Sequence, residues 1–74
     1  MGKRGAIRAF AEAVRACRID RGWSQEELAF QAGLHRNYVS GLERGIRNPS
    51  LTTIVALADA LELTPSALVA RIDK

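Results

Sequence analysis

Apolar side chains recur at steps of three and four residues along the chain, in segments separated by glycine and proline. This spacing places apolar residues on one side of a helix, whereas strands alternate apolar and polar positions. In the first segment the repeating apolar residues are Ile7, Phe10, Val14 and Cys17. Several alanines raise the helix propensity of the same segment. We therefore predict a first helix that ends near Arg21, just before Gly22, with Cys17 buried on its apolar face.

Capping residues predict the next two helices. Ser24 is placed as the N-cap of a helix from Gln25 to about Ala32, and Glu27 is spaced to complete a capping box. After a short turn, a third helix is expected from Arg36 to about Arg44. Its N-cap would be His35, which is a poorer capping residue than serine or aspartate. The apolar stripe of this third helix is narrow, so most of its surface is polar.

Two further helices are predicted in the last third of the chain. Ser50 caps a helix from Leu51 to about Leu61, and Thr64 caps a last helix from Pro65 to Ile72. Leucine, isoleucine and valine are closely spaced in both. The five short helices and their short loops predict an all-α fold, a compact five-helix bundle that forms one domain over residues 1–74.

The composition narrows the range of functions. A chain of 74 residues with one cysteine and one histidine has no internal disulfide and too few ligands for a structural zinc site. It contains no clustered catalytic residues and no glycine-rich phosphate loop. We therefore expect no enzyme activity, no metal and no cofactor. Without an apolar run long enough for a signal peptide or a membrane span, the sequence is typical of a soluble, cytoplasmic protein.

The two central helices match a known DNA-binding arrangement. Residues 24–44 hold two short helices joined by a turn that contains Gly33, as in the helix-turn-helix unit. In that unit the second helix enters the major groove of DNA and the first crosses the backbone. Arginine pairs with guanine and asparagine with adenine, and Arg36 and Asn37 stand in the first turn of the second helix. The pattern therefore predicts direct contact between these two side chains and the bases.

The segment from Ser24 to Leu61 resembles the Cro/C1-type (XRE, lambda-repressor-like) helix-turn-helix domain of phage repressors and bacterial regulators. The blocks in register are SQEELA at 24–29, YVS at 38–40, LERG at 42–45 and NPSL at 48–51. Within this family the chain is most similar to the controller proteins of restriction–modification systems, above all in HRNYVSGLERGIRNPSL. The resemblance implies a transcriptional regulator that binds a palindromic operator in double-stranded DNA as a homodimer.

The resemblance also assigns roles to individual residues. Those that match DNA-contacting positions are Gln25, Arg36, Asn37, Tyr38, Ser40, Arg44, Arg47 and Asn48. Arg18 and Glu43 match a partly buried ion pair between the first and third helices. Two positions depart from the family pattern. His35 replaces a better capping residue, and Gly41 leaves a position that faces the bases without a side chain.

Residues 51–74 carry more apolar side chains than one small core hides, and such a surface usually marks an interface. The residues expected at a dimer interface are Leu51, Leu61, Leu63, Leu68, Val69 and Ile72. This region has a net charge of −1, against +4 for residues 1–23, which suits a surface turned away from DNA. In the basic region, Lys3, Arg4 and Arg8 are equally compatible with a DNA-contacting tail and with ordinary solubilising charge.

Three functions are compatible with these features. The leading hypothesis is a regulator that occupies promoter DNA and blocks or recruits RNA polymerase. The second is the antitoxin of a toxin–antitoxin pair, although the sequence offers no extra segment as a toxin-binding arm. The third is a protein-interaction module that has lost DNA binding, which would favour acidic or apolar residues at positions 36, 37, 44 and 47. The sequence has Arg, Asn, Arg and Arg there, which favours DNA binding.

Overall fold

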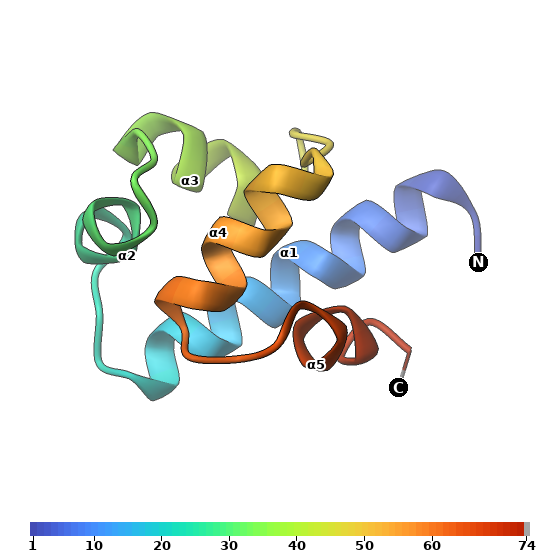
Figure 1. Cartoon of the computed structure of the whole chain (residues 1–74). Coiled ribbons are helices and arrows are strands. Elements are labelled where there is room, and N and C mark those ends of the chain that lie inside the picture. The colour runs from blue at the N-terminus through green and yellow to red at the C-terminus, as the bar shows by residue number, and fades with distance from the viewer. Residues whose placement is uncertain (74) are drawn as a thin grey trace.

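The computed structural model describes residues 1–73, which form five helices joined by short loops (Figure 1). The helices are α1 (Lys3–Asp20), α2 (Gln25–Ala32), α3 (Arg36–Glu43), α4 (Leu51–Ala60) and α5 (Pro65–Ala70). The all-α fold predicted from the sequence is confirmed, and α2 to α5 begin at the predicted residues. Within the described part of the chain, no helix is long and apolar enough to cross a membrane.

The side chains that begin the central helices act as the sequence predicts, with one exception. Ser24 Oγ accepts a hydrogen bond from the backbone N–H of Glu27 at 3.0 Å, and His35 Nδ1 accepts one from the N–H of Asn37 at 3.1 Å. His35 therefore does cap α3. The capping box at α2 is only half formed: the Glu27 carboxylate accepts a hydrogen bond from Gln31 Nε2 at 2.7 Å and none from the backbone N–H of Ser24.

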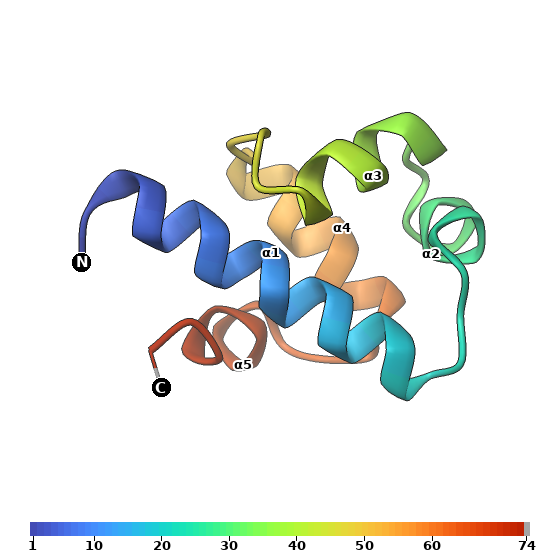
Figure 2. The ribbon, with the colours of Figure 1, turned by 180° about the vertical axis from the view of Figure 1, so that it is seen from behind.

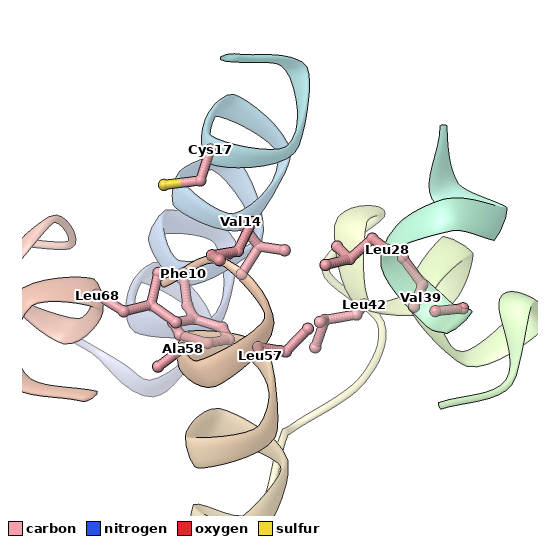
Figure 3. Close-up of a cluster of buried hydrophobic side chains, with 11 residues drawn as sticks. Phe10, Val14, Cys17, Leu28, Val39, Leu42, Leu57, Ala58 and Leu68 are labelled. Atoms are coloured by element: carbon pink, nitrogen blue, oxygen red, sulfur yellow. The ribbon is translucent and has the colours of Figure 1, made fainter. Parts of the chain in front are cut away.

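All five helices contribute to one apolar core (Figure 3). Its buried residues include Phe10, Val14 and Cys17 of α1, Leu28 of α2, Val39 and Leu42 of α3, Leu57 and Ala58 of α4, and Leu68 of α5. Cys17 is 6% exposed and packs as a small apolar residue, as predicted. Because the apolar stripe of α3 is fixed in this core, the polar side of that helix faces outward.

The apolar residues predicted at a dimer interface divide into two groups. Leu61 and Leu68 are 3% and 0% exposed, because they pack into the core of the chain itself. They offer no surface to a second copy, so the interface prediction is wrong for these two residues. The other four keep accessible surface: Leu51, Leu63, Val69 and Ile72.

Candidate functional site

α2 and α3 form the helix-turn-helix unit, and the turn between them depends on Gly33. Gly33 has a φ of 68°, in the left-handed region where a residue with a Cβ is strained. Its N–H donates to the Phe30 carbonyl at 3.3 Å, and the Leu34 N–H donates to the Ala29 carbonyl at 2.8 Å. These two bonds close the end of α2 in a Schellman motif, and they set the direction in which the chain enters α3.

The outward side of α3 carries the residues predicted to contact bases. Val39 and Leu42, on the opposite side, are 0% and 1% exposed and attach the helix to the core. Arg36 and Asn37 are exposed in the first turn, as the sequence predicts. These two polar side chains are therefore exposed to solvent, and the packing of the opposite side against the core holds the helix in place.

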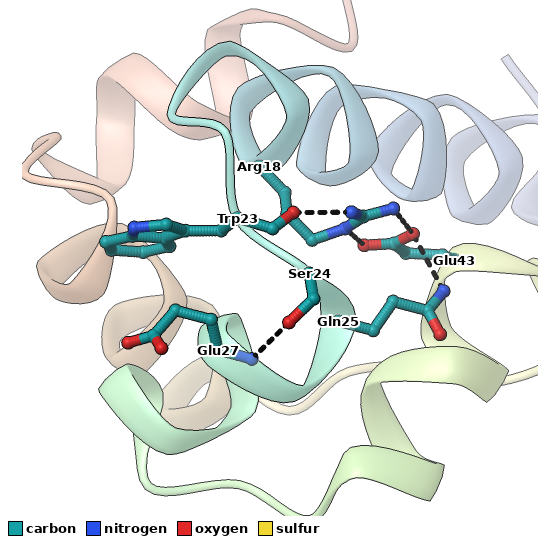
Figure 4. Close-up of polar contacts among 6 residues, drawn as sticks. All are labelled: Arg18, Trp23, Ser24, Gln25, Glu27 and Glu43. Carbon is teal, nitrogen blue, oxygen red and sulfur yellow. Dashed lines mark hydrogen bonds and ion pairs between the residues drawn. The ribbon is translucent and has the colours of Figure 1, made fainter.

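An ion pair joins α3 to α1, and a hydrogen bond to the same carboxylate joins α3 to the start of α2 (Figure 4). Arg18 donates from Nε to Glu43 Oε2 at 2.7 Å and from Nη2 to Glu43 Oε1 at 2.9 Å. Arg18 Nη1 also donates to the Trp23 carbonyl at 2.8 Å, and Gln25 Nε2 donates to Glu43 Oε1 at 3.1 Å. The Arg18 and Glu43 side chains are 12% and 3% exposed. This is the partly buried pair that the resemblance implies, and it fixes the orientation of α3.

The Arg18–Glu43 pair keeps its positive member charged throughout the neutral range. The hydrogen bond to Glu43 raises the pKa of Arg18 above its ordinary value; burial opposes this shift, and the negative charge of Glu43 supports it. A cation whose pKa is raised on folding stabilises the fold at every pH below its unfolded pKa. The contribution of Arg18 is therefore lost only as the pH rises above that already high value.

Gly41 lies one turn beyond Asn37, on the same side of α3. Gly41 is buried, because the side chain of Arg47 covers it, and a Cβ added to it would lie 3.2 Å from both Cγ and Nε of Arg47. The guanidinium carbon of Arg47 lies 5.7 Å from the centroid of the Tyr38 ring, within the range of a cation–π contact. The missing side chain at position 41 therefore lets Arg47 lie across α3.

Replacing Gly41 with alanine should separate stability from binding. In a helix interior alanine is more favourable than glycine by about 1 kcal/mol, whereas the new Cβ would displace the Arg47 side chain. We expect the free energy of unfolding of Gly41→Ala to match the wild type or exceed it by at most about 1 kcal/mol. Affinity for a DNA duplex should fall toward that of Arg47→Ala. Urea denaturation and duplex titration measure the two quantities, and unchanged affinity would show that the position of Arg47 is unimportant.

The remaining predicted site residues lie in separate regions. Ser40 is half-buried on α3, and Arg44 is exposed directly after the end of the same helix. Asn48 lies farther along the chain and, with Pro49, lines an apolar groove of about 160 Å³ between α1, α4 and α5. Gln25 is held by Glu43, and its contact with a DNA phosphate stays a prediction.

The structure shows where the three cations near the N-terminus lie, a point that the sequence left open. Lys3, Arg4 and Arg8 do not form an extended tail, because α1 begins at Lys3. Arg4 and Arg8 lie one helical turn apart and line a pocket of about 280 Å³ together with Arg44. Their four-residue spacing is the sequence signal that places both on one side of a helix. The proximity of Arg44 depends on how α1 and α3 pack.

Comparisons with known proteins agree with this geometry. Residues 14–68, which include all of α2, α3 and α4, match the helix-turn-helix family HTH_3. The chain is 45% identical over 60 residues to control protein C.BamHI from Bacillus amyloliquefaciens, covering 80% of this chain and 74% of that protein. It is 44% identical over 61 residues to control protein C.SmaI from Serratia marcescens, covering 82% of this chain and 73% of that protein. The crystal structure of the restriction-modification controller protein C.AhdI from Aeromonas hydrophila has a TM-score of 0.81 and 48% identity, over 84% of this chain and 94% of that one.

Proposed function

The chain belongs to the helix-turn-helix family HTH_3, and on this premise we propose that it is a sequence-specific DNA-binding regulator of transcription. The similarity to three controller proteins supports a narrower proposal, a controller protein of a restriction–modification system. Such a regulator has no catalytic activity and no cofactor. It acts in the cytoplasm by occupying promoter DNA, where it blocks or recruits RNA polymerase.

The observation that carries this proposal is the exposed polar side of α3. In a helix-turn-helix protein the N-terminal residues of the second helix contact base edges in the major groove. Arg36 and Asn37 occupy those positions and are exposed. Their donor and acceptor groups suit guanine and adenine respectively. Arg44 and Arg47 follow at the end of the helix and after it, where cations contact phosphates that position the protein without reading sequence.

The proposal includes a homodimer that forms through one surface of the chain. This C-terminal apolar surface consists of Leu51, Ile54, Val55, Val69 and Ile72. Leu51, Val55 and Val69 are 74%, 37% and 39% exposed, while Ile54, Val69 and Ile72 line the same apolar groove. A two-fold dimer through it would set two α3 helices about 34 Å apart, one turn of DNA. On this proposal residues 24–44 form the helix-turn-helix unit and residues 51–74 contain the dimerisation region.

Selection of binding sites from random double-stranded DNA tests the function and the dimer together. We expect a palindromic consensus with half-sites about one helical turn apart, and affinity that falls steeply as salt is raised. If no sequence is enriched and binding is insensitive to salt, the result would favour the protein-interaction module instead. The neighbouring genes separate a controller, which lies beside restriction and methylation genes, from an antitoxin, which lies beside a toxin gene.

Arg36→Ala should weaken binding to the selected site by about 1–3 kcal/mol and relax the preference at one base pair of each half-site. The reason is the loss of a bidentate contact to one base. Binding to random duplex should change much less, because that binding depends on phosphates. Parallel titrations of the selected and random duplexes measure both effects. Equal losses on the two duplexes would mean that Arg36 contacts the backbone and does not read a base.

A further inference from the structure

The N-terminal half of α1 and the end of α3 enclose a pocket with three arginines. We call it the arginine pocket; its volume is about 280 Å³, and its lining consists of Arg4, Ile7, Arg8, Arg44, Gly45 and Ile46. Figure 2 shows the loop that follows α3 beside this half of α1. The pocket therefore brings together cations that are about forty positions apart in the sequence.

Gly45 forms the turn that brings the end of α3 next to α1, because its positive φ is a conformation that favours glycine. Its φ of 77° turns the chain sharply after α3, and a Cβ added to it would lie 4.0 Å from the Cα of Arg8. The Gly45 N–H donates to the Leu42 carbonyl at 3.0 Å, and the Ile46 N–H donates to the Gly41 carbonyl at 3.1 Å. Because this turn is hydrogen-bonded, the position of Arg44 next to α1 is part of the fold.

The arginine pocket has no carboxylate of its own. The two ion pairs among residues 1–73 lie elsewhere and join Arg18 to Glu43 and Arg21 to Glu62. Glu12, one turn beyond Arg8 on α1, lines a different cavity next to Ile72. Like charges at neighbouring positions of a helix repel one another. Because no carboxylate lines the pocket, its three positive charges favour the binding of an anion.

We propose that the arginine pocket binds a phosphate of the DNA backbone at the edge of the groove that α3 enters. This inference rests on the proposed DNA-binding function, and it adds α1 to the surface that contacts DNA. Guanidinium groups bind phosphate oxygens through paired hydrogen bonds. One phosphate therefore has enough acceptor oxygens to receive hydrogen bonds from both α1 and the end of α3.

The length of α3 places the pocket near the backbone. α3 has eight residues, which corresponds to about 12 Å of helix, and the major groove is about 12 Å wide. With the first turn of α3 at the bases, its C-terminal end emerges at the sugar–phosphate wall of the groove. Arg44 directly follows that end. A phosphate held there would fix the register of α3 without adding sequence preference.

Arg8→Gln tests the proposal, with Arg15→Gln as the matched control. Both variants remove one exposed charge from α1, but only Arg8 lines the pocket. For Arg8→Gln, the slope of log affinity against log salt should become less steep by about 1. Its affinity should fall by the same factor on the selected site and on random duplex. Arg15→Gln should keep the wild-type slope, and circular dichroism checks that both variants are folded.

Duplexes with single uncharged methylphosphonates locate the contact. At one position per half-site, removal of the phosphate charge should weaken wild-type and Arg15→Gln binding by more than it weakens Arg8→Gln binding, because Arg8→Gln has already lost one of the cations that line the pocket. Equal salt slopes for Arg8→Gln and Arg15→Gln would overturn the pocket inference while the DNA-binding function stands. An Arg8→Gln variant that loses dimers in sedimentation and keeps its salt slope would also overturn it, because the occupant would then be a carboxylate of the second copy. Failure of the wild type to bind any duplex refutes the proposed function itself.

Discussion

Arg18→Met is expected to lower the free energy of unfolding by about 3–5 kcal/mol. The substitution removes the guanidinium that contacts Glu43 at 2.7 and 2.9 Å. It leaves a carboxylate that is 3% exposed, and of its present donors only Gln25 Nε2, at 3.1 Å, remains. A folded domain has about 0.05–0.15 kcal/mol of stability per residue. The loss is therefore a large fraction of the total stability of this chain.

Glu43→Met should cost less, about 1–3 kcal/mol. Arg18 is 12% exposed against 3% for Glu43, so its charge keeps access to water when its partner is removed. It also keeps the Trp23 carbonyl, which accepts from Nη1 at 2.8 Å. The two single substitutions of one ion pair thus have unequal effects because the two side chains differ in burial.

The double variant Arg18→Met/Glu43→Met is the control for this argument. Replacing both members of a buried pair by apolar side chains is often neutral, so the double variant should recover most of the loss seen in Arg18→Met. Urea denaturation followed by circular dichroism measures all four proteins at one concentration, because dimerisation affects apparent stability. A double variant as unstable as Arg18→Met would show that the arginine stem, and not the uncompensated carboxylate, accounts for the loss.

The helices are predictable from the sequence because their signals are local. Ser24, Ser50 and Thr64 each accept a hydrogen bond from the N–H three residues later, so the start of a helix depends on a few consecutive residues. The same is true of the turn at Gly33, where a left-handed backbone requires glycine. The outward position of Arg36 and Asn37 follows from the same local periodicity, which puts Val39 and Leu42 on the other side.

The errors concern residues whose surroundings come from distant parts of the chain. Leu61 and Leu68 are apolar residues like Leu51, and only the packing of α4 and α5 decides that the first two are buried and the third exposed. The same holds for Gly41, which the side chain of Arg47 covers because the loop after α3 folds back over the helix, and no helical periodicity reveals this. The arginine pocket has the same origin, since Arg44 meets α1 only in the folded chain.

Leu51→Glu is expected to weaken binding to a palindromic operator by about 10²–10⁴-fold without destabilising the chain. Leu51 is 74% exposed and is the first residue of α4. An acidic residue in the first turn of a helix interacts favourably with the helix dipole. In a two-fold dimer each copy contributes the same surface, so the substitution would bring two carboxylates into an apolar contact. Two half-sites would then be bound independently, and the gain from linked binding would be lost.

Phe30→Glu is the matched control for the negative charge that Leu51→Glu adds. Phe30 is 79% exposed on α2 and lies outside the C-terminal apolar surface, so its replacement adds the same negative charge without disturbing the proposed dimer. Sedimentation should show Leu51→Glu as a monomer at a concentration at which Phe30→Glu and the wild type are dimers. All three proteins should bind a duplex with a single half-site equally, because α3 is unchanged.

Measuring affinity for both a full site and a half-site separates the location of the dimer surface from its contribution to DNA affinity. If Leu51→Glu stays dimeric, the copies meet through another surface and the assignment of the C-terminal apolar surface is wrong. If it becomes monomeric but keeps its affinity for the full site, the two half-sites are read independently and the dimer adds no affinity. Only a variant that loses the dimer and the full-site affinity together, with half-site binding intact, links this surface to operator recognition. That result would also explain why a small chain leaves Leu51 and Val69 74% and 39% exposed: a second copy covers them.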